Sequence, residues 1–263
     1  MTQTKRPSLT VGVAIVTLNE SRTIRKTLES ISWADEIVVV DSGSTDGTQD
    51  IVKSTQAKLL HQTWMGYAKQ KQFAIDQLTT DWILVLDGDE WLDQSTLDFK
   101  EWLNQKTELF MGFRLHRAQI FLNRLLRHGR GIDTPIRLFK KGKGHFNNAS
   151  IHEEILIQGA CGEAPFWIIH LSAPSIHERL QTIFRDVEAA LKENKSQIPY
   201  GLRKIVFMPI SYFLIQIFKR SAWKDGIPGL IFSLLSTFEQ FLLCARIYES
   251  QQTPDKSYPT RLT

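Results

Sequence analysis

The sequence predicts an α/β fold: an open, mostly parallel (mixed) sheet flanked by helices, with a C-terminal amphipathic helical region. Three observations indicate this class. Short apolar and β-branched runs alternate with segments of helical periodicity between residues 11 and 86. Several of these runs end in acidic or amide side chains, as buried parallel strands do where their carboxyl ends form a ligand crevice. From residue 175 onward, apolar residues recur at helical spacing.

The elements are expected in the order βαβαβαβ. Strands are predicted at the apolar runs 11–16, 37–40, 57–60 and 82–86. A first helix is indicated by Ile24, Leu28 and Ile31 on one face, and further helices are expected from about 48 to 56 and from about 67 to 78. This order is typical of a parallel sheet, in which the polar strand ends meet at one edge.

Length and composition allow one large domain and a helical appendage, because the chain has 263 residues and 42% hydrophobic content. We expect a sheet domain at residues 1–174, a helical region at 175–249 and a polar tail at 250–263. The first nine residues are polar and do not resemble a secretory signal. Cys161 and Cys244 are too far apart to suggest a zinc site, and so few cysteines favour a reducing cytosol.

Two acidic motifs follow directly on predicted strands. The first is Asp41-Ser42-Gly43-Ser44-Thr45-Asp46-Gly47, and the second is Asp87-Gly88-Asp89-Glu90. In the second motif, Asp87 and Asp89 are spaced to turn toward one hard cation, Mg²⁺ or Mn²⁺, whose shell is usually completed by water and substrate phosphate. Taken alone, this spacing is also ordinary turn chemistry. Its position at a strand end is what favours a metal site.

Several motifs together resemble family 2 glycosyltransferases with the GT-A fold. They are Asn19-Glu20 after the first strand, the run 38–48, and Leu86 to Glu90. The segment 66–74, Arg137-Leu138-Phe139, Ile151-His152-Glu153 and His170 are similar in order and spacing to the lipopolysaccharide core β-glucosyltransferase subgroup. The resemblance covers roughly residues 10–175 and implies that residues 1–174 form a nucleotide-sugar-binding catalytic domain.

The resemblance implies a site for each part of a UDP-sugar. The nucleotide-sugar-binding residues are expected to be Thr17, Asn19, Glu20, Asp41, Ser42, Lys71, Asp87, Gly88 and Arg137. Asp41 is expected to accept hydrogen bonds from the nucleoside, and Asp87 and Asp89 to hold the metal on the diphosphate. His170 is a further metal ligand on this reading; a hydrogen-bonded structural role is the alternative. Lys71 stands where the family usually has Arg, and it is a point donor rather than a planar fork.

The reaction implied is an inverting single displacement, in which an acceptor hydroxyl attacks the anomeric carbon of a hexose, with glucose from UDP-glucose as the expected donor. The catalytic residues are then Asp89, through the metal, and Glu153, as the base that takes the hydroxyl proton. Glu154 is the second candidate for the base. Alternatively, the acidic pair only begins an edge strand before Ile155.

A basic stretch lies between residues 112 and 144, with nine Lys and Arg against the single acid Asp133. It predicts an anionic neighbour, and Arg137 is our choice to reach the donor diphosphate. A solvated basic face is the alternative for most of these residues, since the net charge is +4. Nucleic acid is not the expected partner, because the sequence has no helix-turn-helix, zinc or RNP pattern.

Two apolar stretches, 205–218 and 227–245, indicate a helical hairpin lying in a membrane interface. Residues 200–248 carry six basic and two acidic residues, which favours contact with anionic lipid through residues 203–246. Neither stretch is a convincing span, because Pro209, Gln216 and Glu239 interrupt them. The alternative is packing on the catalytic domain or a homo-oligomer. We expect a cytoplasmic protein at the inner face of the membrane, acting on a lipid-linked saccharide.

Two other functional classes remain open from sequence alone. A sugar-1-phosphate nucleotidyltransferase would also need a nucleotide and a divalent ion, but no Gly-rich phosphate loop follows the first strand. A non-catalytic peripheral membrane adaptor would account for the hairpin but not for the Asp-x-Asp motif.

Overall fold

The computed structural model describes residues 9–93, 98–147, 153–193 and 202–251. The chain divides into two compact units: Met1–Leu125 with Ile132–Ser172, and Leu126–Gly131 with Ala173–Thr263. The first unit ends at Ser172, close to the boundary that the sequence predicts at 174. Residues 126–131 belong to the second unit although they lie inside the sheet domain in sequence. Most of the predicted polar tail, from 252 onward, lies outside the described residues.

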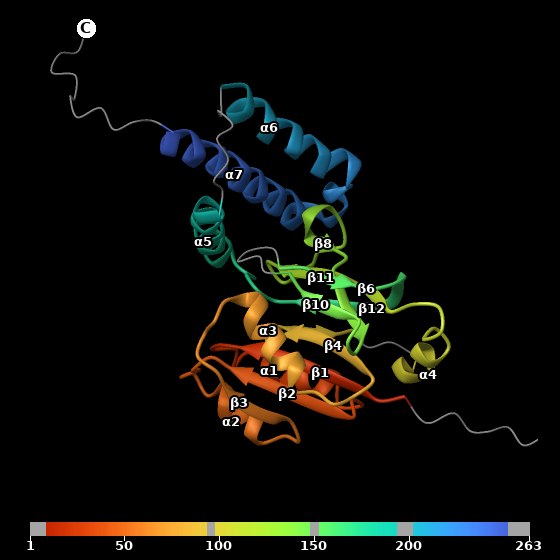
Figure 1. The fold of residues 1–263 in the computed structure, drawn as a ribbon. Helices are drawn as coiled ribbons and strands as arrows, with labels where there is room; N and C mark the ends of the chain where they lie inside the picture. Colours follow the sequence, from red (N-terminus) through yellow and green to blue (C-terminus); the bar gives the residue numbers. More distant parts are fainter. Residues whose placement is uncertain (1–8, 94–97, 148–152, 194–201, 252–263) are drawn as a thin grey trace, which may run out of the picture. The chain divides into compact units, whose positions relative to one another are not determined.

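The first half of the sheet is parallel, in the order β3-β2-β1-β4 (Figure 1). Its strands are β1 (Val11–Thr17), β2 (Glu36–Asp41), β3 (Lys58–His61) and β4 (Trp82–Asp87). They alternate with α1 (Ile24–Ser30), α2 (Thr48–Lys53) and α3 (Tyr67–Asp76). Every residue of β1 is buried, because β1 is central and covered on both faces. The predicted βαβαβαβ order is confirmed.

The second half of the sheet is mixed and continues the order as β9-β6-β12-β5. Its strands are β9 (Ile136–Lys140), β6 (Gly112–Phe121), β12 (Cys161–His170) and β5 (Glu90–Leu92), while β7 (Arg124–Leu125) and β8 (Ile132–Asp133) pair with β6. Strand β9 is antiparallel to β4 and to β6, whereas β12 is parallel to β6. Strands β10 (Gly144–Phe146) and β11 (Ile155–Ile157) form a separate antiparallel pair.

The sheet curls back toward β4. Only Gly88 and Asp89 separate the end of β4 from the start of β5, yet β5 is the last strand of the hydrogen-bonded order. Strand β12 therefore lies near the end of β4, and its last residue, His170, pairs with Glu90 of β5. The curl therefore places His170 beside the motif Asp87-Gly88-Asp89-Glu90.

Each face of the sheet has its own apolar core. On one face, α1, α2 and α4 (Phe99–Asn104) bury Ile24, Val52 and Leu103 against β1 and β4. On the other face, α3 and the β10–β11 pair bury Ala74 and Phe146 (Figure 1). Each fully buried large apolar side chain contributes about 1.5–3 kcal/mol, which holds the strand ends at a fixed edge.

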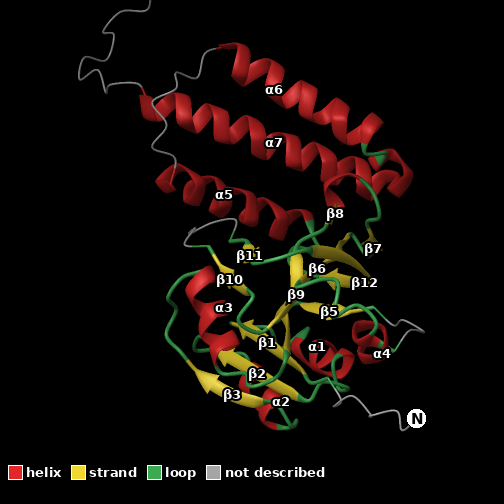
Figure 2. Ribbon diagram, turned by 45° about the vertical axis from the view of Figure 1, so that its right-hand side comes forward, coloured by secondary structure: helices red, strands yellow, loops and turns green. Residues whose placement is uncertain are grey.

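The second unit is helical. It contains the 3₁₀ turn η1 (Gly129–Gly131), α5 (Ile176–Glu193), α6 (Leu202–Leu214), a π-helical turn η2 (Ile215–Lys219), the 3₁₀ turn η3 (Ala222–Asp225) and α7 (Gly226–Gln251). Figure 2 shows α7 lying between α5 and α6, and both helices pack on it. The predicted helical region is confirmed as secondary structure.

A buried carboxylate fixes the segment 126–131 within this unit. Asp225 accepts hydrogen bonds from the backbone N–H groups of Arg127, at 3.0 Å, and His128, at 2.8 Å. Gly129 has a φ of +64°, and a Cβ there would lie 2.8 Å from the Cβ of Ala222. Only glycine suits this position, both for its backbone conformation and for its close approach to η3.

Candidate active site

The strand ends that carry the acidic motifs meet at one edge of the sheet. In the parallel register, Thr17 of β1 pairs with Asp41 of β2, and Val16 pairs with Asp87 of β4. The backbone N–H of Ser42 donates to the carbonyl of Thr17 at 3.1 Å, and that of Gly88 donates to the carbonyl of Val16 at 2.9 Å. The predicted residues of the three motifs are thus brought together.

Hydrogen bonds join the loop after β1 to the loop after β2. Asn19, with a φ of +57°, accepts from the backbone N–H of Thr45 at 2.9 Å. Its own N–H donates to the hydroxyl of Ser44 at 2.8 Å, and the N–H of Glu20 donates to the hydroxyl of Thr48 at 2.8 Å. A left-handed conformation is tolerated by Asn, whose side chain bonds locally here. Asn19 therefore organises this edge through its side chain and its backbone N–H, and Glu20 through its backbone N–H.

Asp41 is buried and has its hydrogen-bonding capacity largely filled. Its carboxylate accepts from the backbone N–H groups of Gly43 and Ser44, both at 2.9 Å, from the Ser44 hydroxyl, and from the Gln49 amide at 2.8 Å. Asp41 thus shapes the loop that would face a nucleoside. Three of these bonds are to Oδ1 and one is to Oδ2, so direct acceptance from a nucleoside by Oδ2, as the sequence suggested, stays a prediction.

Gly88 allows the first and third motifs to approach closely. A Cβ at this position would lie 2.7 Å from Oγ1 of Thr17 and 3.1 Å from Cγ of Glu20. Oγ1 of Thr17 is buried and has no hydrogen-bond partner among the described residues. A buried hydroxyl without a partner costs free energy, so a ligand that bonds to it is favoured.

An ionic network runs inward from Asp87. Nζ of Lys71 lies 2.8 Å from Oδ1 of Asp87 and 2.8 Å from Oε1 of Glu153. A guanidinium nitrogen of Arg137 lies 3.3 Å from Asp87 and 2.8 Å from Glu90, and Arg117 pairs with Glu90 at 2.7 Å. Lys71 has only 3% of its side chain exposed and Glu90 has none. Buried charges persist when they are paired in this way.

The pKa shifts in this network follow from its geometry. Burial acts to raise the pKa of Asp87, but the charges of Lys71 and Arg137 outweigh it and hold the pKa below its ordinary value. Burial likewise opposes ionisation of Glu90, whose pKa is nevertheless lowered by Arg137 and Arg117. Asp87 is therefore a carboxylate already contacted by two cations of the protein.

Asp89 points to a different partner. Its Oδ2 lies 3.0 Å from Nε2 of His170, and its backbone carbonyl accepts from the N–H of Leu171 at 3.1 Å. Burial lowers the pKa of His170, but the charge of Asp89 and the contact with it raise the pKa above the ordinary value overall. Glu20 lies nearby: burial, and then the charge of Asp89, raise its pKa to about 7.

The pair of Asp89 and His170 fits a small divalent cation. Two neighbouring ligands in an octahedral shell of about 2.0–2.1 Å radius lie about 3.0 Å apart, which matches the separation of these two atoms. The pKa of Glu20 is raised mainly by burial and secondly by the charge of Asp89. Across the described ranges, however, no group of three metal-ligating side chains is assembled. The role of Asp87 as a direct ligand stays a prediction.

The sequence of this strand-end region carries a family signature. The family model of glycosyl transferase family 2 matches residues 12–153, which is more than half of the chain. The chain belongs to glycosyltransferase family 2. It is 31% identical to the lipopolysaccharide core biosynthesis glycosyltransferase LpsC of Rhizobium meliloti (strain 1021), an alignment that covers 92% of this chain and 93% of LpsC. An uncharacterized glycosyltransferase of Rickettsia typhi is 27% identical over 91% of this chain and 87% of its own length.

Solved structures also resemble this glycosyltransferase. Glucosyl-3-phosphoglycerate synthase of Mycobacterium tuberculosis, in complex with Mn²⁺, UDP and glucosyl-3-phosphoglycerate, is 24% identical with a TM-score of 0.33, over 43% of this chain and 44% of the synthase. TarS of S. aureus is 14% identical with a TM-score of 0.45, over 88% of this chain and 49% of TarS. The mixed, curled sheet flanked by helices agrees with the predicted α/β fold class.

Four polar residues of the glycosyltransferase site were not assigned by the sequence. Glu90 and Arg117 complete the ionic network, and Gln119 contacts His170. The amide of Gln70 donates to the Ser42 hydroxyl at 3.0 Å. Glu90 had a signal because it closes the Asp-Gly-Asp-Glu motif, and Arg117 belongs to the basic stretch that predicts an anionic neighbour. The contact of Gln119 with His170 depends on β6 and β12 becoming neighbours. His152, which guided the choice of Glu153, lies outside the described residues.

The basic stretch of the glycosyltransferase is divided between the two compact units. Arg117 and Arg137 turn inward to Glu90, whereas residues 126–131, with Arg127 and Arg130, belong to the second unit. Within that unit, Arg130 donates to the Tyr212 hydroxyl at 3.0 Å. Arg137 is buried and contacts Glu90 and Asp87 through one guanidinium nitrogen, so its contact with the diphosphate stays a prediction.

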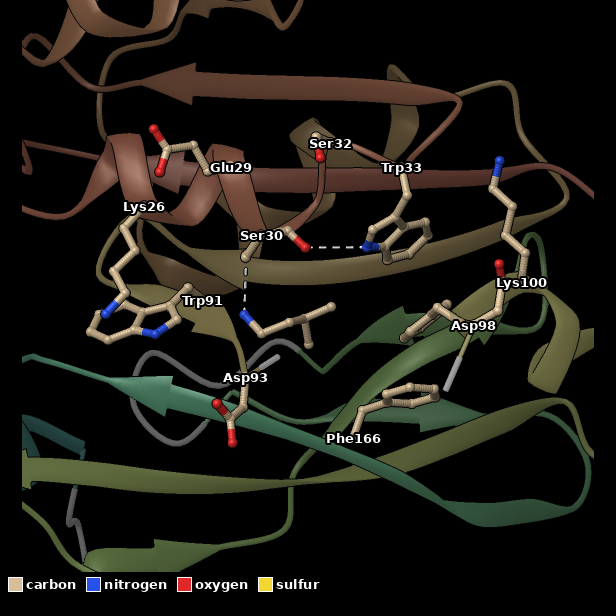
Figure 3. Close-up of a pocket in the computed structure, with 12 residues that line it drawn as sticks. Lys26, Glu29, Ser30, Ser32, Trp33, Trp91, Asp93, Asp98, Lys100 and Phe166 are labelled. Atoms are coloured by element: carbon tan, nitrogen blue, oxygen red, sulfur yellow. Dashed lines mark hydrogen bonds between the residues drawn. The ribbon is translucent and has the colours of Figure 1, made fainter. Parts of the chain in front are cut away.

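A cavity of about 790 Å³ lies on the α1–α4 side of the sheet (Figure 3). Its aromatic residues are already engaged: the ammonium of Lys26 lies 4.0 Å from the centre of the Trp91 ring, and Trp33 stacks on Phe99 at 4.4 Å. None of the residues that the sequence assigned to the glycosyltransferase site lines it. The strand-end edge stays the predicted place of the donor site.

Proposed function

We propose that this glycosyltransferase moves a hexose, glucose from UDP-glucose, onto a lipid-linked saccharide such as a lipopolysaccharide core, with inversion and with Mg²⁺ or Mn²⁺. The observation that carries the proposal is the convergence of Thr17, Asp41 and Asp87 at one sheet edge, with Asp89 turned toward His170. The similarity to LpsC, whose name refers to the lipopolysaccharide core, supports this choice of acceptor.

Each part of the edge has a task in this proposal. The loop shaped by Asp41 and Ser42 receives the nucleoside, and the unpartnered hydroxyl of Thr17 offers it a further bond. A cation held by Asp89 and His170, with Asp87 as the third predicted ligand, would offset charge on the departing diphosphate. Glu153 takes the proton from the attacking hydroxyl, and Glu154, which is exposed, is the alternative base.

Lys71 connects the donor end of the proposed site to the proposed base. One ammonium group contacts both Asp87 and Glu153, each at 2.8 Å. Nothing in this arrangement requires an Arg, because two single contacts suit a point charge better than a planar fork. We infer that Lys71 holds Glu153 near the anomeric carbon while it contributes positive charge on the diphosphate side.

UDP release from a panel of nucleotide sugars, with a membrane lipid extract as acceptor and with added Mn²⁺ or EDTA, tests the proposal. We expect turnover with UDP-glucose that EDTA abolishes. Glu153→Gln is expected to lower kcat by about 10²–10⁴-fold, the usual contribution of a general base, while UDP-glucose still binds. Unchanged turnover in Glu153→Gln would move the base to another residue, with Glu154→Gln as the next variant.

Two further measurements, pyrophosphate release and thermal stabilisation by UDP, separate the alternative functions. A sugar-1-phosphate nucleotidyltransferase would release pyrophosphate from a nucleoside triphosphate instead of UDP from a nucleotide sugar. A non-catalytic adaptor would show no metal-dependent thermal stabilisation by UDP, whereas a ligand at 100 times its Kd stabilises by about 2.7 kcal/mol. Either outcome would refute glycosyl transfer as proposed here.

The acceptor proposal includes contact with the inner face of a membrane, at the outer faces of α6 and α7. Large apolar side chains are exposed along both helices, at Val206, Phe207, Ile210, Leu214, Ile215, Phe218, Trp223, Ile227, Leu230, Leu234, Phe238 and Phe241. Lys219, Arg220 and Lys224 lie at the turn between the helices. An apolar face with flanking cations suits the interface of an anionic bilayer.

We infer that α7 lies in the interface and does not cross the bilayer. Residues 222–251 are long and apolar enough to span a membrane, but one third of an apolar 18-residue segment within them is buried inside the protein. The buried side of α7 combines the polar residues Ser233, Ser236 and Glu239 with apolar ones such as Phe232 and Ile247, and Glu239 pairs with Arg179 of α5 at 2.6 Å. A helix that packs on one side and exposes apolar side chains on the other is typical of interfacial binding.

Flotation with vesicles tests the membrane contact. We expect the protein to float with vesicles rich in phosphatidylglycerol, less with phosphatidylcholine, and to be released by high salt in part. Replacing Phe218 and Ile227, which are 72% and 73% exposed, by Glu should abolish flotation. Leu109→Glu, at an equally apolar and 63% exposed site outside these helices, is the matched control. A stable dimer by sedimentation, without flotation, would assign this face to self-association.

A further inference from the structure

Gln119 of β6 lies behind His170, on the side of the ring away from Asp89. The side-chain amide nitrogen of Gln119 lies 2.7 Å from Nδ1 of His170, while Nε2 of the same ring faces Asp89 at 3.0 Å. The hydroxyl of Ser172 contacts the amide oxygen of Gln119 at 3.3 Å. These contacts form one chain, Ser172–Gln119–His170–Asp89, across β6, β12 and the β4–β5 turn.

The position matters because the two ring nitrogens of histidine have different tasks when it binds a metal. A neutral imidazole binds through the nitrogen that carries no hydrogen, so binding through Nε2 requires the hydrogen on Nδ1. Metal-binding histidines usually donate that hydrogen to a carboxylate or carbonyl oxygen, which fixes both the tautomer and the orientation of the ring. At His170, Gln119 occupies this position, with its amide nitrogen, a donor, toward Nδ1.

We propose that Gln119 is a positioning residue, which orients His170 and, after a half-turn of its amide, accepts from Nδ1–H when Nε2 is offered to a divalent cation beside Asp89. This inference rests on the proposed metal-dependent transfer, and it adds a residue that the acidic motifs do not contain. Gln119 touches neither cation nor sugar in this arrangement, and its effect reaches the site only through the imidazole.

An amide is well suited to this task because it carries both an acceptor and a donor. With its nitrogen toward Nδ1, it bonds to a ring that has its hydrogen on Nε2, and that hydrogen then lies toward Asp89. A half-turn of the amide places its oxygen toward Nδ1–H instead and leaves Nε2 free for the cation. The Ser172 hydroxyl both donates and accepts, so it bonds to the amide in either orientation.

Three variants separate positioning from simple packing. Gln119→Leu keeps a similar volume and removes both polar atoms. Gln119→Glu keeps an oxygen that accepts from Nδ1–H, so it retains the function that the proposal requires. Gln105→Leu makes the same chemical change at an exposed position of the same unit and serves as the control.

The readout is binding of Mn²⁺ in the presence of UDP, measured by the electron paramagnetic resonance signal of free Mn²⁺. We expect Gln119→Leu to weaken binding by about 10–100-fold, as loss of an outer partner of a metal-binding histidine usually does. Gln119→Glu should bind within about 3-fold of the wild type or more tightly, on the same grounds. The control should match the wild type, and the melting temperature of each variant reports on folding.

A second measurement reads the tautomer directly. This measurement uses nuclear magnetic resonance with ¹⁵N-labelled histidine and diamagnetic Mg²⁺. The His170 resonances are identified by their loss in His170→Gln. They should show hydrogen on Nδ1 in the wild type and in Gln119→Glu. Gln119→Leu should show a mixture. If Gln119→Leu and the wild type had the same Mn²⁺ affinity and the same His170 tautomer, this inference would be overturned but the proposed function would not. A wild type that binds no Mn²⁺ with UDP would overturn both the inference and the metal-dependent function.

Discussion

Asp89→Asn is expected to lower turnover by about 10³-fold or more while the fold remains intact. Asparagine keeps the shape of the side chain but removes the charge that would hold a cation beside Nε2 of His170. A bound cation contributes several kcal/mol to stabilising charge on a leaving group, and about 4 kcal/mol corresponds to about 10³-fold in rate. Because the effect acts on the transition state, kcat should fall more than the affinity for UDP-glucose.

The measurement is UDP release at saturating UDP-glucose over a range of Mn²⁺ concentrations, for the wild type and for the variant. Asp50→Asn, at an exposed site on α2, removes one carboxylate without touching the sheet edge and should leave kcat unchanged. If Asp89→Asn were as active as the wild type at low Mn²⁺, or if EDTA had no effect on either protein, the metal site would have to be abandoned.

Glu90→Gln is expected to lower the free energy of unfolding by about 3–5 kcal/mol, the usual result of removing one member of a buried ion pair. Glu90 is fully buried and contacts Arg117 at 2.7 Å and Arg137 at 2.8 Å, and it accepts from the backbone N–H of Asp87 at 3.0 Å. Glutamine would keep one acceptor but leave the guanidinium charge of Arg137 balanced by Asp87 alone.

The same network predicts how stability depends on pH. The pKa of Glu90 is lowered in the folded protein, so its contribution to stability is present above the unfolded-state pKa of about 4.3 and is lost as pH falls through the folded value. The wild type should therefore lose stability on acidification below about pH 4.3 more steeply than Glu90→Gln. Asp87, whose pKa is also lowered, adds to the loss in both proteins.

Urea unfolding at pH 7 and at a series of lower pH values measures both effects. Glu101→Gln, at an exposed position of α4, controls for the loss of one carboxylate and should shift the midpoint little. A Glu90→Gln protein as stable as the wild type at neutral pH would show that the two arginines find equivalent partners without it.

The parallel part of the fold was predictable because its signals are local. The interiors of β1, β2 and β4 are apolar runs, and these strands end in Thr17, Asp41 and Asp87 at the points where the chain turns. Parallel strands place such ends side by side by necessity. The convergence of the acidic motifs therefore follows from the alternation of strands and helices, with no knowledge of packing.

The internal chemistry of the site was not predictable in the same way. Nothing in the sequence near Asp41 indicates that its carboxylate is filled by its own loop, or that Asp87 and Glu153 share Lys71. These contacts join residues that are separated by up to 82 positions in the chain. Because charge pairing in the interior is set by distance and burial, local sequence contains little information on it.

By itself, the sequence determined the family, the order of strands and helices in the nucleotide half, and the edge to which Asp87 and Asp89 are delivered. The tertiary structure alone decided that β12 returns beside the β4–β5 turn, which gives Asp89 the partner His170 and gives His170 the partner Gln119. The physical reason is that strand ends are local features of the chain. Side-chain neighbours across a curled, mixed sheet are set by hydrogen-bond register and packing between distant segments.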